Sequence, residues 1–448
     1  MSVYNEGAMK IRLLNLWESL RTSFWFIPAV MTFLAVALSF LTVFIDRRIG
    51  SDANIFGFIY SGGPEGARLI LSTIAGSMIT VAGLTFSITI VALTLASSQF
   101  GPRLLRNFMH DTGNQVVLGT FIAAFAYSLL VLRTVHIVEG EDFVPSISVA
   151  VALVLALAGI AVLIYFIHHV SASMQAEQVI STVSHDLEEK IRRLFPEELE
   201  DGVERDVEGE AGRRIAEDSH DKSADVLAAR SGYLQALDHR GLLELATEKD
   251  LLVLLLCRPG DFVVEGSPLI TVKSSEDINK GLAGRLSSAV IVGAQRTPEQ
   301  DAEFAVHQLV EVAIRSLSPG INDPYTAVSC VDKLGSALCF LCGREFPSPY
   351  LYDGEDNLRV ILKPETFTGI INAAFDQIRQ YGRQSVAVTI RLLETLGMIA
   401  VQARTHEQRE AILHQAEMIQ RGSAEALHEE NDIEDVRRRF EAVLDILA

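Results

Sequence analysis

The apolar and polar residues of this chain are distributed unevenly along its length. Up to about Ile167 long uncharged apolar runs dominate, and beyond it the sequence is charged and strongly acidic. A helix of roughly 20 apolar residues crosses the hydrocarbon core of a bilayer. The pattern therefore predicts transmembrane helices over residues 24–45, 69–98, 116–138 and 147–167, the third being long enough only if Arg133 snorkels to the interface.

The remaining segments follow from the same pattern. Residues 1–22 form a short polar N-terminus, and 23–169 hold the four spans. Apolar residues recur at helical spacing from Val170 to Leu194, which predicts a connecting helix over 170–195 that continues the fourth span and offers an apolar seam to a partner. The chain then continues as an acidic loop over 196–222, a small α/β domain over 223–297 and a mainly helical domain over 298–448.

The second apolar run contains a stripe of small and hydroxyl-bearing residues. Successive members lie 4, 4, 3, 4, 7 and 4 residues apart, which keeps them on one face of a helix. Lipid-facing positions gain nothing from such residues. The face therefore predicts either close packing against another helix or the lining of an aqueous path between subunits, and the spacing leaves both open. The stripe comprises Ser72, Gly76, Thr80, Gly83, Ser87, Thr94 and Ser98.

Charged residues narrow the class of membrane protein. The first, second and fourth predicted spans contain no Asp, Glu, Lys, Arg or His. Proton- and ion-coupled transporters usually need such groups at membrane depth, so this class loses support. A pore lined by hydroxyl groups needs no charged group at membrane depth. A channel for an ion or small solute therefore stays consistent with the sequence.

An even number of spans places both termini on one side of the membrane. Five basic residues flank the spans on that side and four on the other, which weakly favours cytosolic termini under the positive-inside rule. The acidic loop Glu139–Asp142 supports the same orientation. The basic residues are Lys10, Arg12, Arg21, Arg103 and Arg106 on the terminal side, and Arg47, Arg48, Arg68 and Arg133 opposite.

Two further loops contain candidate binding residues. After the stop signal at Gly101, Arg103 and Arg106 lie in a short amphipathic segment, which predicts contact with lipid phosphates at the interface. In "SPGINDPYTAV", Ser318, Asn322 and Asp323 precede a predicted helix, and they either form a helix–loop–helix connector or bind a small ligand at that helix N-terminus.

Composition excludes several functions. The net charge of -19 lies mostly in the polar half, which argues against a nucleic-acid partner. The four cysteines all fall in that half, and their low density is typical of reduced thiols in a cytosolic compartment. No nucleophile–base pair, metal cluster or phosphate-binding glycine loop stands out, so we expect neither enzyme activity nor a cofactor or metal.

The block "AGSMITVAGLTFSITIVALTLASSQFGPRLLRNFMHD", with "RSGYLQALD", "RPGDFVVEGSPL" and "SPGINDPYTAV" further on, resembles a known family. It is a family of predicted bacterial inner-membrane proteins that is catalogued only as a domain of unknown function. The resemblance covers nearly the whole chain and implies a bacterial inner-membrane location. It implies no substrate and no catalytic residue.

The sequence thus predicts an α-helical integral membrane protein with four transmembrane helices, followed by a mixed α/β and then mainly helical cytosolic domain. Its partners are expected to be the lipid bilayer and further copies of itself. The leading functional hypothesis is a homo-oligomeric channel-like protein gated or assembled by its cytosolic domain. The alternative is a non-conducting membrane-anchored sensor or scaffold whose cytosolic domain binds a ligand or partner.

Overall fold

A computed structural model describes residues 25–49, 63–101, 111–135, 143–173, 175–197, 222–275 and 278–448 of the chain. The predicted polar N-terminus, Arg103 and Arg106, and most of the predicted acidic loop lie outside these ranges. The chain divides into two compact units, Met1–Gln178 and Val179–Ala448.

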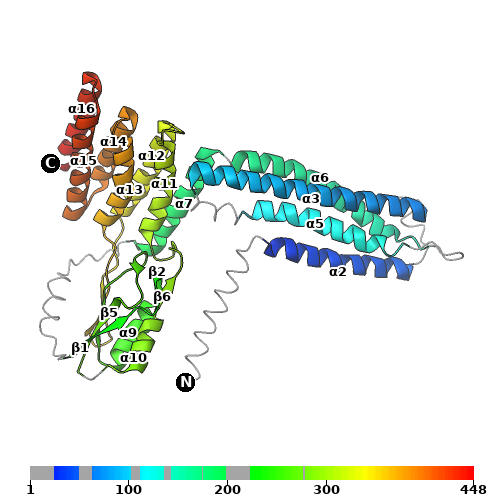
Figure 1. Ribbon diagram of the computed structural model, residues 1–448, viewed down its shortest axis with the longest axis horizontal. Helices are drawn as coiled ribbons and strands as arrows, with labels where there is room; N and C mark the ends of the chain where they lie inside the picture. The colour runs from blue at the N-terminus through cyan, green and yellow to red at the C-terminus, as the bar shows by residue number, and fades with distance from the viewer. Residues whose placement is uncertain are drawn as a thin grey trace. The chain divides into compact units, whose positions relative to one another are not determined.

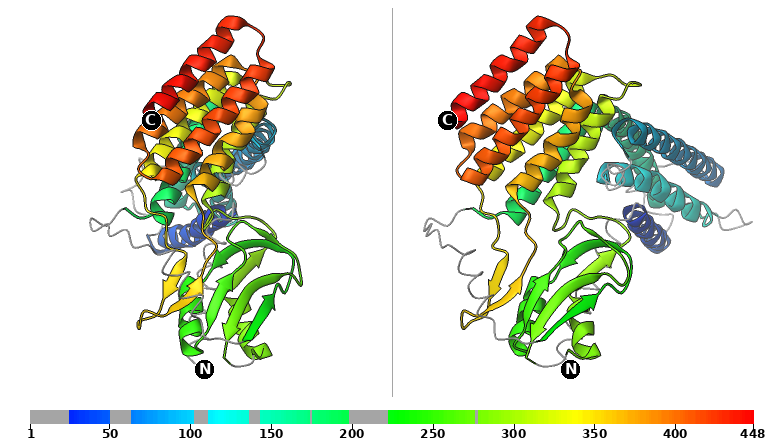
Figure 2. Two further views of the ribbon diagram at one scale, coloured as in Figure 1. Left: turned by 90° about the vertical axis from the view of Figure 1, so that its left-hand side faces the viewer. Right: turned by 60° about the vertical axis from the view of Figure 1, so that its left-hand side comes forward.

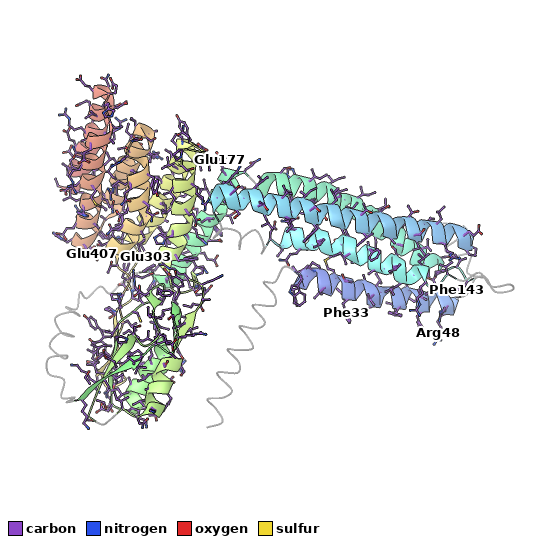
Figure 3. All side chains as sticks on the ribbon, viewed as in Figure 1. Phe33, Arg48, Phe143, Glu177, Glu303 and Glu407 are labelled. Carbon is purple, nitrogen blue, oxygen red and sulfur yellow. The ribbon has the colours of Figure 1, made fainter. Side chains whose placement is uncertain are left out.

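The first unit is a bundle of long apolar helices (Figure 1). Helix α5 packs against each of the other three, and all four contribute to one apolar core that contains Leu71, Phe121 and Tyr127. Large apolar side chains also project outward, as Phe33 does from the side of α2 (Figure 3), where 72% of its surface is exposed. The helices are α2 (Phe26–Ile49), α3 (Pro64–Phe100), α5 (Thr112–Leu132) and α6 (Ser146–Ser173).

Helix α3 is the longest helix described. Its 37 residues span roughly 55 Å at 1.5 Å per residue, which exceeds the hydrocarbon core of a bilayer. Its end lies two residues beyond the predicted Ser98: the helix stops at Phe100, and Gly101, which the sequence marks as a stop signal, adopts a φ of 110° that favours glycine. Its start lies five residues earlier than predicted, at Pro64, which suits the first turn because its missing N–H has no helical partner there.

The prediction of one uninterrupted helix from the fourth span to Leu194 is wrong. Helix α6 ends at Ser173, and α7 (Ala176–Leu194) begins beyond Gln175. Near this end the hydroxyls of Ser171 and Ser173 donate to the carbonyls of Ile167 and Val170. Such local bonds compete with regular helix geometry near this end of α6.

The apolar seam of α7 is used within the chain. Ile180, Val183, Leu187 and Ile191 are each at most 2% exposed. The seam was predicted to face a partner subunit, and this prediction is wrong because the second unit itself covers it. The 3.6-residue periodicity correctly predicted which face of α7 is buried. It did not predict that the same chain, and not a partner subunit, buries that face.

The second unit combines an α/β lobe with a helical bundle (Figure 2). The lobe contains a five-stranded sheet in the order β1-β5-β3-β8-β7, in which only β3 and β8 are parallel, and an antiparallel sheet in the order β4-β2-β6. Its core includes Leu234, Val253, Ile270 and Leu286. The elements are β1 (Lys222–Leu227), β2 (Gly232–Leu237), α9 (His239–Glu248), β3 (Leu252–Leu255), β4 (Phe262–Val263), β5 (Pro268–Ser274), α10 (Lys280–Ser288), β6 (Val290–Gly293), β7 (Tyr350–Tyr352) and β8 (Leu358–Ile361).

The helical bundle of the second unit follows β6, with β7 and β8 inserted after its second helix. Each helix contacts at least two neighbours, and α14 contacts α12, α13, α15 and α16. The helices are α11 (Ala302–Ser316), α12 (Pro324–Cys342), α13 (Phe367–Gly382), α14 (Val386–Gln402), α15 (His406–Ala426) and α16 (Glu430–Leu447).

By length and composition alone, five helices among the described residues could cross a membrane. Four of them are α2, α3, α5 and α6, which overlap the predicted spans. The bounds of the third span were predicted wrongly: α5 begins four residues before the predicted 116–138 and ends at Leu132, so the helix does not extend past Arg133. The fifth is α12, which the sequence did not single out. It packs against α11 and α14, and Cys330, Leu334 and Leu341 on it are fully buried. Burial among neighbouring helices gives α12 the environment of a helix in the core of a bundle.

Candidate functional site: the outer face of helix α3

Helix α3 has two opposite faces. Its buried side faces the other helices of the bundle, whereas all seven stripe residues are exposed. At 3.6 residues per turn the stripe lies on the side of the helix opposite the buried set. The bundle of the chain itself therefore does not use the stripe. The buried residues are Ala67, Leu71, Ile74, Ala75, Met78, Ala82, Thr85, Thr89, Ala96 and Phe100.

The glycines of the stripe are not required by contacts within the chain. A Cβ atom added at Gly76 or Gly83 would meet nothing within 4 Å. By contrast, a Cβ at Gly119 or Gly159 would lie 2.6 Å or 3.2 Å from a methionine sulfur inside the bundle. Glycine in a helix interior costs about 1 kcal/mol relative to alanine. The presence of Gly76 and Gly83 thus points to a close approach by something outside the chain.

The stripe hydroxyls donate hydrogen bonds to their own helix. Thr80 Oγ1 donates to the carbonyl of Gly76 at 2.8 Å, and Ser87 Oγ to that of Gly83 at 2.9 Å. Ser72, Thr94 and Ser98 make the same kind of bond at 3.0, 2.9 and 2.8 Å. Their donor protons therefore do not require water, while each oxygen keeps the capacity to accept.

Large apolar side chains flank the stripe on both sides. Ile79 and Phe86 lie on one side, with 44% and 48% of their surface exposed. Leu84 and Val91 lie on the other side, with 57% and 59% exposed. A strip of small residues between apolar ridges is the surface that lets two membrane helices approach closely.

At one end of the bundle, a buried carboxylate that the sequence did not single out joins two helices. Asp46, near the end of α2, is 8% exposed and accepts hydrogen bonds from the backbone N–H groups of Ile147 and Ser148 at 2.9 and 3.0 Å. It also accepts from Ser148 Oγ at 2.6 Å. Pro145 precedes α6 and has no side-chain acceptor, so the cap comes from another helix. That missing cap was the available signal in the sequence.

The same end carries a buried tyrosine. Tyr127 on α5 is fully buried, and its hydroxyl lies 2.9 Å from Thr42 Oγ1 on α2 and donates to the carbonyl of Ser148 at 3.2 Å. Thr42, Asp46, Tyr127 and Ser148 thus connect three helices through hydrogen bonds. The first predicted span contained no charge because it was predicted to end at Ile45, one residue before Asp46.

Removing this cap is expected to destabilise the bundle. Asp46→Ala leaves two N–H groups of α6 without their acceptor, so we expect the unfolding free energy to fall by about 2 kcal/mol. Thermal unfolding of the full chain in detergent, followed by circular dichroism, measures the effect. Glu65→Ala removes an exposed acid at the start of α3 and is the matched control. Equal melting temperatures for the two variants would contradict the capping role.

The other end of the bundle carries an aspartate–histidine pair. Asp111 caps α5 by accepting from the N–H of Gly113 at 2.9 Å, and its other oxygen lies 2.5 Å from Nε2 of His169 on α6. Tyr165 stacks on the His169 ring with 5.2 Å between ring centroids. A Cβ at position 113 would lie 2.9 Å from His169 Nε2, so the glycine permits this contact. The pair holds the start of α5 to the end of α6.

The candidate ligand loop is largely occupied by its own bonds. Asp323 caps α12 by accepting from the N–H and the hydroxyl of Thr326 at 3.2 and 2.6 Å, and the hydroxyl bond is the main reason that the pKa of Asp323 is lowered. Ser318 Oγ donates to the carbonyl of Arg315 at 2.6 Å, and Asn322 has a φ of 52°. These bonds account for the loop as a helix connector, and a ligand role for Ser318, Asn322 and Asp323 stays a prediction.

Comparison with known proteins gives a family match and uncharacterised relatives. The family described as Predicted membrane protein (DUF2254) matches residues 21–398. Uncharacterised proteins of Mycobacterium bovis and Mycobacterium tuberculosis are each 33% identical over 422 residues, which cover 93% of this chain and 79% of the relative. No solved structure matches the chain.

Proposed function

We propose that this chain, which belongs to the DUF2254 family of predicted membrane proteins, forms a homo-oligomeric channel-like pore in which α3 lines the axis between subunits. The observation that carries the proposal is the outward direction of the polar stripe. Hydroxyl and glycine residues on a lipid-facing surface would gain nothing, and the bundle of the chain does not cover them. Further copies of the chain, with water between them at some levels, satisfy such a face.

In this proposal α2, α3, α5 and α6 cross a bacterial inner membrane, and both termini lie in the cytosol. Helix α12 stays in the bundle of the second unit, which gates or assembles the pore. Arg103 and Arg106 contact lipid phosphates at the cytosolic end of α3. Transport of an ion or small solute, and not catalysis, is the activity we expect.

A second candidate function rests on the bonds of the hydroxyls. Because each stripe hydroxyl donates to its own helix, the face can also be packed dry against a second copy. The protein would then be a non-conducting membrane-anchored sensor or scaffold, and its second unit would bind the ligand or partner.

Cysteine accessibility and flux distinguish the two functions. Thr80→Cys, Ser87→Cys and Thr94→Cys are labelled with a charged thiol reagent in liposomes, and Leu84→Cys is the lipid-facing control. A water-lined stripe predicts labelling at least about tenfold faster than at position 84, and loss of solute flux after labelling. Uniform protection of all four positions supports the scaffold. Liposomes that pass no ion or solute at any pH, tension or voltage would contradict the pore.

A further inference from the structure

A group of charged side chains lies where the α/β lobe meets the helical bundle of the second unit. We call it the charged junction and define it as Arg258, Arg296, Asp301, Glu303 and Glu365. Arg258 follows β3, Arg296 and Asp301 lie between β6 and α11, Glu303 is in the first turn of α11, and Glu365 lies between β8 and α13. Figure 3 shows Glu303 at the end of the bundle that meets the lobe.

The members of the charged junction are bonded across the two parts. Arg258 Nη2 donates to Glu303 Oε1 at 2.6 Å, and Arg296 donates to both oxygens of Asp301. Glu365 Oε1 accepts from the N–H of Ala302, at the start of α11, at 3.0 Å. Only 1% of the Asp301 side chain and 15% of the Glu303 side chain are exposed. Ion pairs and hydrogen bonds therefore connect the lobe to this end of the bundle.

Glycine makes the close packing of the junction possible. Gly260, in the loop after β3, has a φ of 94°, and a Cβ there would clash with Asp301 and lie 2.9 Å from Arg296 Nε. The backbone of the lobe thus lies directly against the N-cap of α11. The charges of the junction therefore lie directly at the start of that helix.

The charges of the junction balance only when Glu365 is neutral. Lys363 lies 3.0 Å from Asp261, beside the junction. With these two residues included there are three cations and three anions, and an ionised Glu365 adds a fourth anion. Glu407 of α15, which accepts a hydrogen bond from the Thr368 hydroxyl at 3.1 Å, is not part of this count. The cations are Arg258, Arg296 and Lys363, and the anions are Asp261, Asp301 and Glu303.

We propose that the charged junction is a proton-controlled joint, which holds the α/β lobe against the helical bundle when Glu365 is protonated and releases it when Glu365 ionises. The joint would give the second unit two arrangements that differ with cytosolic pH. It involves no residue of α3, so it stands or falls independently of conduction.

The electrostatics set the pH range of the joint. Burial, followed by the charge of Asp301, raises the pKa of Glu365 from 4.5 to about 7, although the N–H of Ala302 and the charge of Arg258 act in the opposite direction. The closed joint therefore holds more protons than an open one between these values, and its stability falls as the pH rises from about 4.5 to about 7. If Glu365 regains its ordinary pKa on opening, the opening equilibrium increases about tenfold between pH 6 and pH 8.

Hydrogen exchange of the full chain in lipid nanodiscs tests the joint. The peptide that holds the N–H groups of Ala302 and Phe304 is compared between wild type and Glu365→Gln at pH 6 and pH 8. The ratio of the two rates removes the intrinsic pH dependence of exchange. We expect this ratio to rise about tenfold from pH 6 to pH 8, because glutamine keeps the shape of the acid and cannot ionise. Glu299→Gln changes an exposed acid nearby and should behave as wild type.

A ratio that stays constant between pH 6 and pH 8 would overturn the proposal, as would a Glu299→Gln variant that behaves like Glu365→Gln. If the glutamine variant does not fold, the wild type alone suffices. Exchange of the 302–304 peptide is then divided by that of a buried α14 peptide at each pH. An increase of about tenfold in this quotient supports the joint, and an unchanged quotient refutes it.

Discussion

Gly83→Ile is expected to dissociate the proposed oligomer while leaving the fold of the subunit unchanged. The position is exposed on the side of α3 away from the bundle, and a Cβ there meets nothing within 4 Å, so we expect the subunit to accommodate the larger side chain. In the proposed contact with a second copy of α3, however, the branched side chain would separate two backbones that approach closely. Overpacking costs about 1–3 kcal/mol at each contact, so we expect dissociation constants at least about fivefold higher.

Native mass spectrometry or single-molecule photobleaching measures the number of subunits, and circular dichroism checks the fold. Ser77→Ile is the matched control, because Ser77 is also small and exposed on α3 but lies off the stripe. The control should keep the wild-type assembly. If Gly83→Ile and Ser77→Ile assemble equally well, the stripe is not the contact, and the pore proposal loses the observation that carries it.

The stripe illustrates what periodicity can predict. The seven positions could be placed on one face of α3 from their spacing alone, and the structure shows that face exposed. Spacing could not tell which face the bundle would cover, because Thr85 and Thr89 are also polar and yet lie in the buried set. Hydroxyls that bond back to their own helix are tolerated on either face, so composition does not separate the two.

The cap from Asp46 and the charged junction were missed for a common reason. Both depend on residues far apart in the sequence: Asp46 lies about 100 positions from the N–H groups that it caps, and Arg258 lies 45 positions from Glu303. Hydrophobic periodicity is a local signal and carries no information on such pairs. Taken alone in the sequence, Asp46 is typical of the polar end of a membrane span, and Glu365 is typical of an acid on the protein surface.

Helix α7 shows the same limit for an apolar face. The repeat of apolar residues predicted that one side of the helix would be covered, and Val183 and Leu187 are indeed buried. The sequence does not say whether a second copy or another part of the same chain provides the cover. Here it is the second unit, whose helical bundle had been predicted only as a class of structure.

Leu187→Ala is therefore expected to destabilise the second unit and not its assembly. The side chain is fully buried, so its truncation removes apolar contacts and leaves a cavity. Such substitutions lower the unfolding free energy by about 2–5 kcal/mol. Pulse proteolysis of the full chain in detergent across a urea series measures this loss. Glu189→Ala, at an exposed position of the same helix, should stay within about 0.5 kcal/mol of wild type.

This measurement distinguishes two explanations for the apolar face of α7: a contact between subunits, or burial within the chain itself. If α7 were a contact between subunits, Leu187→Ala would shift the oligomer towards monomers and leave the urea midpoint of the second unit in place. Because Ile180, Val183 and Ile191 are buried without a second copy, we expect the opposite: a lower midpoint and an unchanged number of subunits. Together with Gly83→Ile, this result would place the contact between subunits on α3 and the folding core on α7.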